Sequence, residues 1–504
     1  MLKRALAVIG LVILSNGAYA QNHGGKVELG VEQAIAGFDP LVVGVFDTGP
    51  SAVAALLFDT LTRLDHEGKV MPRLATSWKA SDDFKSWTFT LRPGVTFHDG
   101  SSFDAAAVAF NYARMLDPKN HCRCAIYISG IERVDATAPL EVVFHLSNPA
   151  TNLPELLSPP TSFTVIQSPK AIAEGGEAYN RHPVGTGPFL LKSWSAGDRI
   201  VVARNPNYWN PGHPYLDEVT IRPLADAQAR FASLLSGESD IIWHDNADDI
   251  LAAKQNPALA VHDYVGSGAT VYAFNMARPP FDDLRVRQAL RMALDTKTFA
   301  ATLLDGLWQP AKDPYGPGSL IHCADTDTPA YDPEKAKALL KAYGKKVSFK
   351  LTVTATPRGR AFGQIFQEYW KAVGAEVTLN QVDQTTLVTE AFTRNFDITP
   401  WRIADFSDPG VQMYANFHTG SPLNLASYSN PEIDHWLEAA RANVDHDKIT
   451  AAYCRIATLL NHDIPWFWLT ENHYFAIAKP ALKGIPPQRT NVIDLSEAWW
   501  DRKE

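Results

Sequence analysis

The clearest pattern of apolar and polar positions lies in residues 87–115. Apolar side chains alternate with polar ones from Trp87 to Leu91, which is the period of a half-buried strand. A Pro-Gly turn, a second alternating stretch at 95–97 and an Asp-Gly turn then predict a hairpin. Ser102 is the expected N-cap of a helix, because apolar residues recur at helical spacing from there to Met115.

Shorter patterns of the same kind fill the rest of the N-terminal half. Residues 27–31 alternate like a strand, and residues 51–64 predict an amphipathic helix with a Ser N-cap. Residues 132–146 predict two strands about an Ala-Pro turn. A helix at 225–235 and a short strand at 240–243 follow.

From residue 333 onward, predicted helices alternate with predicted strands. The helices are 333–343, 360–372, 383–392, 431–441 and 447–460, and the strands are 347–353, 376–379, 396–400, 464–469 and 474–478. Strands separated by helices are typical of βαβ units, in which helices cover both faces of the sheet. The pattern therefore predicts an α/β protein.

The length of the chain indicates more than one domain. At 504 residues it is too long for a single core, so two or three domains are expected. The aromatic share of 11% fits either two large cores or a ligand cleft lined by aromatic rings, and the composition does not choose between them.

The N-terminus has the pattern of a cleaved signal peptide. Lys3 and Arg4 precede an apolar run at 5–14, which is too short to span a bilayer, and an A-x-A site ends at Ala20. Because no Cys lies at the junction, we expect cleavage after Ala20 to release a soluble protein into the periplasm of a Gram-negative cell.

The formal net charge of −9 narrows the classes of partner. The expected signal peptide contains one Lys, one Arg and no acid, so its removal leaves the chain more negative still. An acidic chain without a basic block argues against nucleic acid and against anionic lipid surfaces as partners.

Four cysteines leave the redox chemistry open. They are Cys122, Cys124, Cys323 and Cys454. An oxidising compartment permits disulfides, and four cysteines allow three full pairings between which the sequence does not choose. Cys454 lies in a helical stretch, where we expect a buried free thiol. The C-x-C spacing lacks the second pair of ligands that a structural zinc needs, so no metal site is predicted.

Motifs for catalysis are missing from the chain. It contains no H-E-x-x-H, G-x-S-x-G or Walker A motif. A Gly-x-Gly at Gly185 and Gly187 is followed by a strand-like segment, so no helix N-terminus is available to hold a phosphate and a structural turn is expected there. We therefore predict a protein that is not an enzyme and needs no cofactor.

As a string of residues, the opening stretch resembles the signature of the extracytoplasmic solute-binding proteins of family 5. These are the dipeptide-, oligopeptide- and nickel-binding components of ABC importers. The resemblance rests on LATSW at 74–78, WTFTLRPGVTFHDG at 87–100 and NPNYW at 205–209, and it covers essentially all of the chain after residue 20.

The resemblance implies a fold. It implies a two-lobe periplasmic binding protein of type II, in the large cluster C form, with an extra subdomain in the first lobe and the ligand cleft between the lobes. The expected division is a signal peptide at 1–20, a discontinuous lobe 1 at 21–50, 180–266 and 471–504, an extra subdomain at 51–179, and lobe 2 at 267–470.

The resemblance also implies a function. A monomer would capture a peptide or peptide-like solute by hinge closure and deliver it to the permease subunits of an ABC importer at the inner membrane. The same scaffold could instead carry a nickel chelate, an opine or an oligosaccharide. A secreted hydrolase is a further alternative, but it needs a nucleophile and base for which the sequence offers no motif.

Candidate ligand-binding residues lie in the passage WRIADFSDP, which directly follows a predicted strand. Open α/β sheets bind ligands at the carboxyl ends of their strands. By resemblance, Asp408 would hold the ligand's α-amino group with Asp405 in support, and Trp401 or Phe406 would cover the peptide plane. The alternative is that both aspartates only cap turns before the following proline.

Three arginines are candidates for binding a ligand carboxylate, which a guanidinium group can match with two hydrogen bonds. Arg358 and Arg360 fall near the carboxylate-binding arginine of the family, although the segment between them and Trp370 is shorter here. Arg402, beside Trp401, is the third. For each of them, a solvated surface side chain is the alternative.

Overall fold

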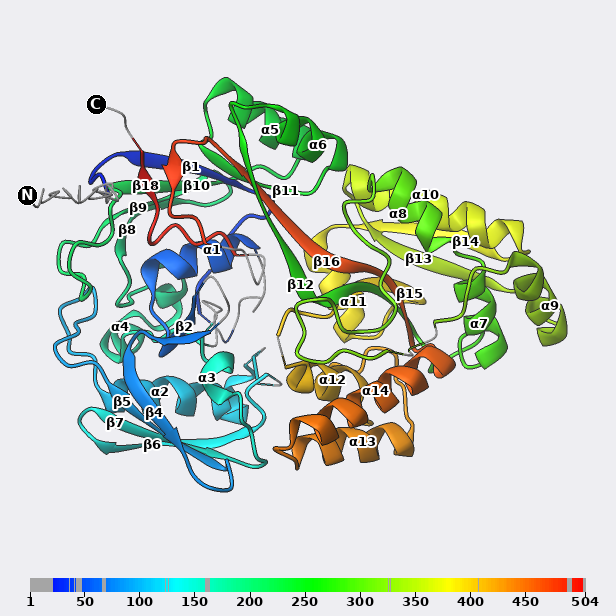
Figure 1. Ribbon diagram of the computed structural model, residues 1–504, viewed down its shortest axis with the longest axis horizontal. Coiled ribbons are helices and arrows are strands. Elements are labelled where there is room, and N and C mark those ends of the chain that lie inside the picture. The colour runs from blue at the N-terminus through cyan, green and yellow to red at the C-terminus, as the bar shows by residue number, and fades with distance from the viewer. Residues whose placement is uncertain are drawn as a thin grey trace, which may run out of the picture.

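A computed structural model describes residues 21–35, 37–39, 41, 48–65, 69–122, 124–125, 127–158, 164–324, 326, 328–406, 408–486 and 492–501. The expected signal peptide at 1–20 lies outside the described residues. Within them, no helix is both long enough and apolar enough to cross a bilayer. The chain forms two lobes that lie side by side (Figure 1).

One mixed ten-stranded sheet runs through both lobes. Its strands, in spatial order, are β14 (Glu376–Val382), β13 (Ser348–Thr354), β15 (Ile398–Arg402), β12 (Ala260–Phe274), β16 (Trp466–Ala478), β11 (Ile241–His244), β1 (Lys26–Val31), β10 (Glu218–Pro223), β9 (Arg199–Arg204) and β8 (Phe189–Ser195). The long antiparallel strands β12 and β16 cross from one lobe to the other (Figure 1). The prediction of separate strands at 464–469 and 474–478 was wrong, because a single strand covers both.

The crossing strand β12 is irregular between Val265 and Ala269, where its pairing with β16 shifts register. Two glycines in this segment are packed too tightly for any side chain. A Cβ atom at Gly266 would lie 2.1 Å from Oδ1 of Asp405, and one at Gly268 would lie 2.1 Å from the carbonyl oxygen of Ile403. The loop after β15 is therefore packed directly against the strand that joins the lobes.

In the lobe on the right of Figure 1, helices cover both faces of the sheet. One face carries α7 (Leu284–Met292), α8 (Thr296–Leu303), α9 (Pro333–Tyr343) and α10 (Pro357–Ala372), and the other carries α11 (Gln384–Phe392), α12 (Gly410–Phe417), α13 (Pro431–Arg441) and α14 (His446–Asp463). Trp370 is fully buried in the first of the two cores and Trp466 is buried in the second. The predicted α/β layering is confirmed.

The other lobe contains α1 (Thr48–Leu57), α5 (Ala227–Ser236) and α6 (Ala247–Gln255). The helix predicted at 51–64 was too long, because the Leu57 carbonyl accepts a hydrogen bond from the Gly187 amide at 3.0 Å and the chain then forms β2 (Thr62–Leu64), which pairs with β3 (Val70–Pro72). A Cβ atom at Gly187 would lie 2.4 Å from the Leu57 carbonyl carbon. The Gly-x-Gly is thus a close-packed turn.

The extra subdomain, at the lower left of Figure 1, is a four-stranded antiparallel sheet packed on a helix. Its strands, in spatial order, are β4 (Ala75–Ala80), β5 (Ser86–Leu91), β7 (Glu141–Leu146) and β6 (Ile131–Ala138), and its helix is α2 (Ala105–Leu116). The strand predicted from Trp87 to Leu91 is β5, with Trp87, Phe89 and Leu91 buried.

Two details of the predicted hairpin and helix were wrong. Residues 95–97 do not form a strand, because only a single bridge, from Thr96 to Ser102, joins the two sides of the turn. Since Ser102 is used in that bridge, the helix begins later, and its N-cap is Asp104, whose Oδ1 accepts a hydrogen bond from the Ala107 amide at 2.9 Å.

The remaining elements are short and lie in connecting segments. They are α3 (Leu153–Leu156), α4 (Pro169–Gly175), the 3₁₀ turns η1 (Pro118–Asn120) and η2 (Gly176–Arg181), and the paired strands β17 (Leu482–Lys483) and β18 (Trp499–Trp500).

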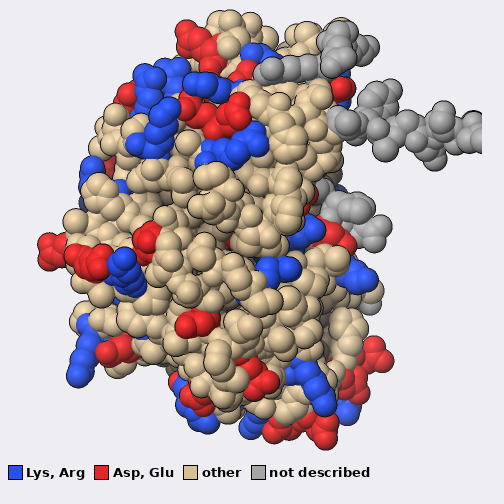
Figure 2. Space-filling model, turned by 90° about the vertical axis from the view of Figure 1, so that its left-hand side faces the viewer, with Lys and Arg blue, Asp and Glu red and all other residues tan. Residues whose placement is uncertain are grey.

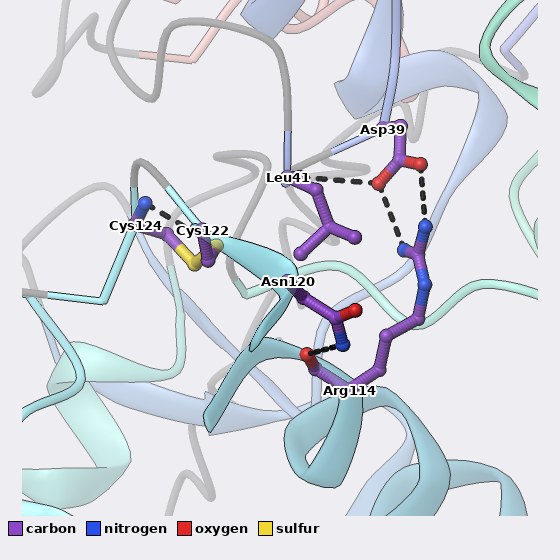
Figure 3. The surroundings of a disulfide bond; sticks show 6 residues. All are labelled: Asp39, Leu41, Arg114, Asn120, Cys122 and Cys124. Atoms are coloured by element: carbon purple, nitrogen blue, oxygen red, sulfur yellow. Dashed lines mark hydrogen bonds and ion pairs between the residues drawn. A yellow bond between two sulfur atoms is a disulfide. The ribbon is translucent and has the colours of Figure 1, made fainter. Parts of the chain in front are cut away.

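All four cysteines form disulfides. Cys122 pairs with Cys124, two positions further along the chain, next to the bidentate ion pair between Arg114 and Asp39 (Figure 3). Cys323 pairs with Cys454 on α14. The expectation that Cys454 is a buried free thiol was therefore wrong. Cys454 lies at a part-exposed position of α14, where Cys323, 131 residues away in the sequence, lies close enough to form the disulfide.

A buried carboxylate joins the subdomain to its lobe. Asp59 is 0% exposed and accepts hydrogen bonds from four side chains. The donors are Arg73 Nε at 2.6 Å, Trp209 Nε1 at 2.7 Å, Thr186 Oγ1 at 3.0 Å and Tyr208 Oη at 3.1 Å. Because a buried charge is tolerated only when it is paired and hydrogen-bonded, this network fixes the loops that meet here.

Candidate functional site

A pocket of about 110 Å³ lies between the extra subdomain and the other lobe. One wall is built from the segments that precede β6 and follow β7, and the other from α12, α13 and α14. Its lining residues are Tyr127, Ile128, Ser129, Gly130, Ile131, Leu146, Asn148, Pro149, Ala150, Thr151, Asn152, Leu153, Leu156, Asp408, Gly410, Val411, Tyr414, Ala440, Arg441, Asn443, Ile449 and Tyr453.

Most of the lining is apolar or aromatic. Ile128 and Leu153 come from the subdomain, and Val411 and Ile449 face them from the other lobe. Small-molecule sites are commonly apolar cavities between domains, with a few polar groups that fix the ligand's orientation. In this pocket, the charged groups among the lining residues are Asp408 and Arg441.

Asp408 presents a carboxylate without a countercharge. Its Oδ1 accepts the Gly410 amide hydrogen at 2.8 Å, at the first turn of α12. No Lys, Arg or His of the described residues lies within ion-pair distance of Asp408. Burial raises the pKa of Asp408, and the hydrogen bond from Gly410 and, after it, the more distant charge of His446 oppose that rise. The site is therefore suited to a cationic group that would supply the missing charge.

Arg441 is the matching cation. It lies in the last turn of α13, is half-buried, and its guanidinium carbon lies 3.9 Å from the ring centroid of Tyr414. No carboxylate of the described chain lies within ion-pair distance of it. The pocket thus has one acid and one base, neither of them paired with a protein charge.

Asp405, predicted to support Asp408, is engaged elsewhere. Its carboxylate accepts hydrogen bonds from the Gly268 amide at 2.8 Å, from Asn472 Nδ2 at 3.1 Å and from the hydroxyl of Tyr474. Burial raises its pKa, and the hydrogen bond from Tyr474 opposes the rise. These donors belong to β12 and β16, so Asp405 binds the loop after β15 to the crossing strands.

The two aromatic candidates also lie outside the pocket lining. Phe406 is 8% exposed and packs into the core of the extra subdomain, although it comes from the opposite lobe. Trp401 is half-buried on β15, where its ring contacts Phe392 in an edge-to-face arrangement at 6.0 Å. Phe406 thus joins subdomain and lobe at one edge of the site.

Arg358 lies at the junction of the two lobes. At the start of α10, its Nη1 ion-pairs with Oδ2 of Asp245 at 3.0 Å, and Oδ1 of Asp245 lies 3.1 Å from Nη2 of the fully buried Arg230. Asp245 follows β11 in one lobe and α10 belongs to the other. The Arg358 guanidinium also covers the ring of Trp308, 5.1 Å from its centroid.

Glu32 and Arg402 belong to the same charged junction. Burial, and next the charge of Asp245, raise the pKa of Glu32 to about 7, while Arg358 and Arg402 oppose the rise. Arg402 lies 5.8 Å from the ring centroid of Tyr474. Its charge also opposes the rise that burial causes in the pKa of the pocket residue Tyr127. Arg402 therefore lies within electrostatic range of both the junction and the pocket.

Arg360 takes part in neither group. From the first turn of α10, its Nη1 donates to the carbonyl of Ala355 just before the helix at 2.7 Å, and it is not among the pocket-lining residues. Of the seven residues predicted from sequence, the structure places Asp408 in the pocket, Arg358 and Arg402 at the charged junction, and the other four outside both.

Sequence reasoning missed several residues that this geometry brings to the site. Arg441, Tyr453 and Tyr414 lie on regular helices, where their spacing is that of ordinary helix residues. Glu32 and Asp245 each follow a strand of the ten-stranded sheet. That last position was a usable signal, because ligands bind at the carboxyl ends of strands in open α/β sheets.

No metal centre was found among the described residues, where no group of three or more His, Cys, Asp or Glu side chains is placed to hold an ion. Cys122 and Cys124 are consumed in their disulfide and offer no thiolate.

On the face shown in Figure 2, Lys and Arg side chains are interspersed with Asp and Glu, so the described residues there form no broad area of one charge.

Comparisons with known proteins give a consistent result. Residues 69–424 match the family model described as bacterial extracellular solute-binding proteins, family 5 Middle. The chain is 29% identical over 468 residues to the glutathione-binding protein GsiB of Pectobacterium atrosepticum, and the match covers 90% of each chain.

Solved structures share the fold. The periplasmic binding protein DppA of Helicobacter pylori, in complex with the peptide STSA, matches with a TM-score of 0.86 and 23% identity over 95% of this chain and 99% of that one. MoaA of A. tumefaciens R10, in complex with mannopinic acid, matches with a TM-score of 0.86 and 23% identity over 95% and 100%. The predicted two-lobe binding-protein fold is thereby confirmed.

Proposed function

Because this chain belongs to the bacterial extracellular solute-binding proteins of family 5, we propose that it captures a peptide or peptide-like solute between its lobes and delivers it to an ABC importer. Hinge closure around a ligand is the established motion of two-lobe binding proteins. The crossing strands β12 and β16 are the connections about which such closure would occur. The role is capture and release, without chemical conversion of the solute.

The observation that carries the peptide assignment is the unpaired carboxylate of Asp408 in an otherwise mostly apolar pocket. A ligand ammonium would give Asp408 the short, charge-assisted hydrogen bond that it lacks within the protein. The α-amino group of a peptide is such a group. An oligosaccharide carries no cation, so it would leave the part-buried charge of Asp408 uncompensated.

The relatives support the same class of solute. GsiB is a glutathione-binding protein by name, and the DppA structure contains a peptide. Glutathione is a modified tripeptide with one amine and two carboxylates. We therefore propose small peptides, glutathione among them, as the solutes to test first.

The remaining parts of the proposal concern the protein's processing, location, oligomeric state, partner and domain division. We propose cleavage after Ala20, a periplasmic location, a monomeric state, and docking on the permease subunits of an importer at the inner membrane. The division into lobe 1 at 21–50, 180–266 and 471–504, a subdomain at 51–179 and lobe 2 at 267–470 is proposed with them.

A thermal-shift screen of the purified protein without residues 1–20 tests the proposal. Ligand binding to the native state stabilises the protein by mass action and so raises its melting temperature. At a ligand concentration a hundredfold above Kd, the gain in unfolding free energy is about 2.7 kcal/mol. We expect a rise with glutathione, dipeptides or tripeptides, and none with oligosaccharides or nickel–histidine. A rise only with one of the latter would contradict the peptide assignment, and turnover of a hit in mass spectrometry would contradict the binding role.

A further inference from the structure

We infer that Arg441 binds the carboxylate of the solute, so that the pocket selects zwitterions by pairing Asp408 with an amine and Arg441 with an acid. This inference rests on the proposed function, because it assigns the second charged end of the same solute. It also assigns the carboxylate to a different arginine from the three that the sequence suggested.

The first argument is charge balance within the pocket. Asp408 and Arg441 are the charged residues of the lining, and neither has a countercharge of the described protein within ion-pair distance. Unpaired charges at a site partly screened from water are costly, and a partner of opposite sign reduces that cost. A solute with one positive and one negative group supplies both partners at once.

The second argument is placement. Tyr453 is buried in the pocket wall beside Asp408, because a Cβ atom at Gly410 would lie 2.8 Å from the Tyr453 hydroxyl and 3.0 Å from Oδ1 of Asp408. Burial, and next the charge of Asp408, raise the pKa of the Tyr453 hydroxyl, and the charge of Arg441 opposes that rise. Both charged groups therefore act on one side chain of the pocket from the same lobe. Tyr414 lies under the Arg441 guanidinium and packs against it at the pocket wall.

The third argument is the state of the other arginines. Arg358 is already paired with Asp245, and Arg360 donates to the Ala355 carbonyl. A guanidinium that is engaged with a protein carboxylate must give up that bond before it can bind a ligand carboxylate. Arg441, with its ring contact and no carboxylate partner in the described chain, needs no such exchange.

Isothermal titration calorimetry with matched probes tests the inference. The probes are trialanine and trialanine C-terminal amide, which differ only in the terminal carboxylate. We expect the wild type to bind the acid more tightly than the amide. In Arg441→Gln, the affinity for the acid falls roughly 10- to 100-fold, the range of one charge-assisted hydrogen-bonded pair, while the affinity for the amide is unchanged.

Two further variants serve as controls. Arg455→Gln removes a neighbouring guanidinium of α14 that pairs with Glu432 outside the pocket, and it should keep the wild-type preference for the acid. Arg402→Gln tests a competing cation, whose charge acts on the pocket residue Tyr127. Undiminished discrimination in Arg441→Gln, or its loss in Arg402→Gln instead, would overturn the assignment of Arg441.

The two levels of the proposal fail in different ways. If the wild type binds neither trialanine probe nor glutathione, the proposed function is overturned and this inference with it. If the wild type binds both trialanine probes equally well, the proposed capture of peptides stands and the carboxylate-binding role of Arg441 is overturned.

Discussion

Arg358 of one lobe and Asp245 of the other form an ion pair, with 3.0 Å between Nη1 and Oδ2. The contact joins the N-terminal end of α10 to the residue that follows β11. Asp245 is itself held by the buried Arg230, so the ion pair connects a rigid anchor in one lobe to a part-exposed side chain in the other.

This contact predicts that Arg358 favours the closed arrangement of the lobes. Arg358→Gln removes the ion pair while leaving Asp245 paired with Arg230, so the ligand-free protein should open. Because Arg358 is part-exposed, the pair contributes about 1 kcal/mol or less, equivalent to about a fivefold change in the ratio of closed to open molecules. Small-angle X-ray scattering should show a larger radius of gyration.

Arg360→Gln is the matched control for that variant, since the Arg360 side chain donates to the carbonyl of Ala355, just before its own helix, and forms no ion pair with a carboxylate of the described chain. Its scattering curve should equal that of the wild type. Equal radii of gyration for Arg358→Gln and the wild type would show that the ion pair does not bias the lobes.

Replacement of Asp59 should be strongly destabilising. Asp59→Asn leaves the buried Arg73 without its ion-pair partner, and the loss of one partner from a buried pair costs about 3–5 kcal/mol. Urea unfolding followed by circular dichroism measures the loss. Glu334→Gln is the comparison, because that side chain is 80% exposed in its pair with Lys337 and should change the stability by less than about 0.5 kcal/mol. Similar effects of the two changes would contradict the account of this network.

The two disulfides should differ in their effect on stability. In the chain-entropy picture, a cross-link between residues 131 positions apart stabilises by about 5 kcal/mol, and one between residues 2 positions apart by less than about 2 kcal/mol. The double variant Cys323→Ser/Cys454→Ser should therefore melt well below Cys122→Ser/Cys124→Ser. Differential scanning calorimetry of the two double variants decides this, and the opposite order would refute it.

Glu32 should make stability depend on pH near neutrality. Its pKa is about 7 in the folded protein, above the ordinary value of 4.5 that applies in the unfolded chain. Between these values the folded state binds more protons, so the wild type loses stability as the pH rises from about 4.5 to about 7. Glu32→Gln removes this loss.

Melting temperatures across the pH range test that prediction. Glu32→Gln and the wild type should melt alike at pH 4, and the variant should melt higher at pH 8. A difference between them that does not change with pH would mean that the Glu32 carboxyl does not titrate in this range.

Local sequence signals predicted much of the fold. The helices at 333–343 and 431–441 match α9 and α13 to the residue, because each begins with a proline after a capping side chain, Asp332 or Asn430. The strand β16 was split in the prediction because polar residues interrupt its apolar pattern. Asn472, one of them, is buried and donates to Asp405 and to the Ile403 carbonyl, contacts between distant segments that no local pattern contains.

The candidate site was only partly predictable for the same reason. The sequence pointed to Asp408, which lines the pocket, and equally to Asp405, which lies three residues earlier and binds the crossing strands. Which of the two faces the pocket depends on Gly268 and Tyr474, far away in the sequence. Arg441 has the position of an ordinary C-terminal helix cation, and only the packing of α13 against the pocket distinguishes it.

The central claim is that the Asp408 carboxylate binds the amine of the solute, and calorimetric titration of Asp408→Asn tests it most directly. The asparagine keeps the size of the side chain and removes its charge. With glutathione or trialanine at pH 7, we expect the affinity to fall roughly 10- to 100-fold, the loss of one charge-assisted hydrogen bond, while the melting temperature of the unliganded protein does not fall. Wild-type affinity in Asp408→Asn would contradict the account.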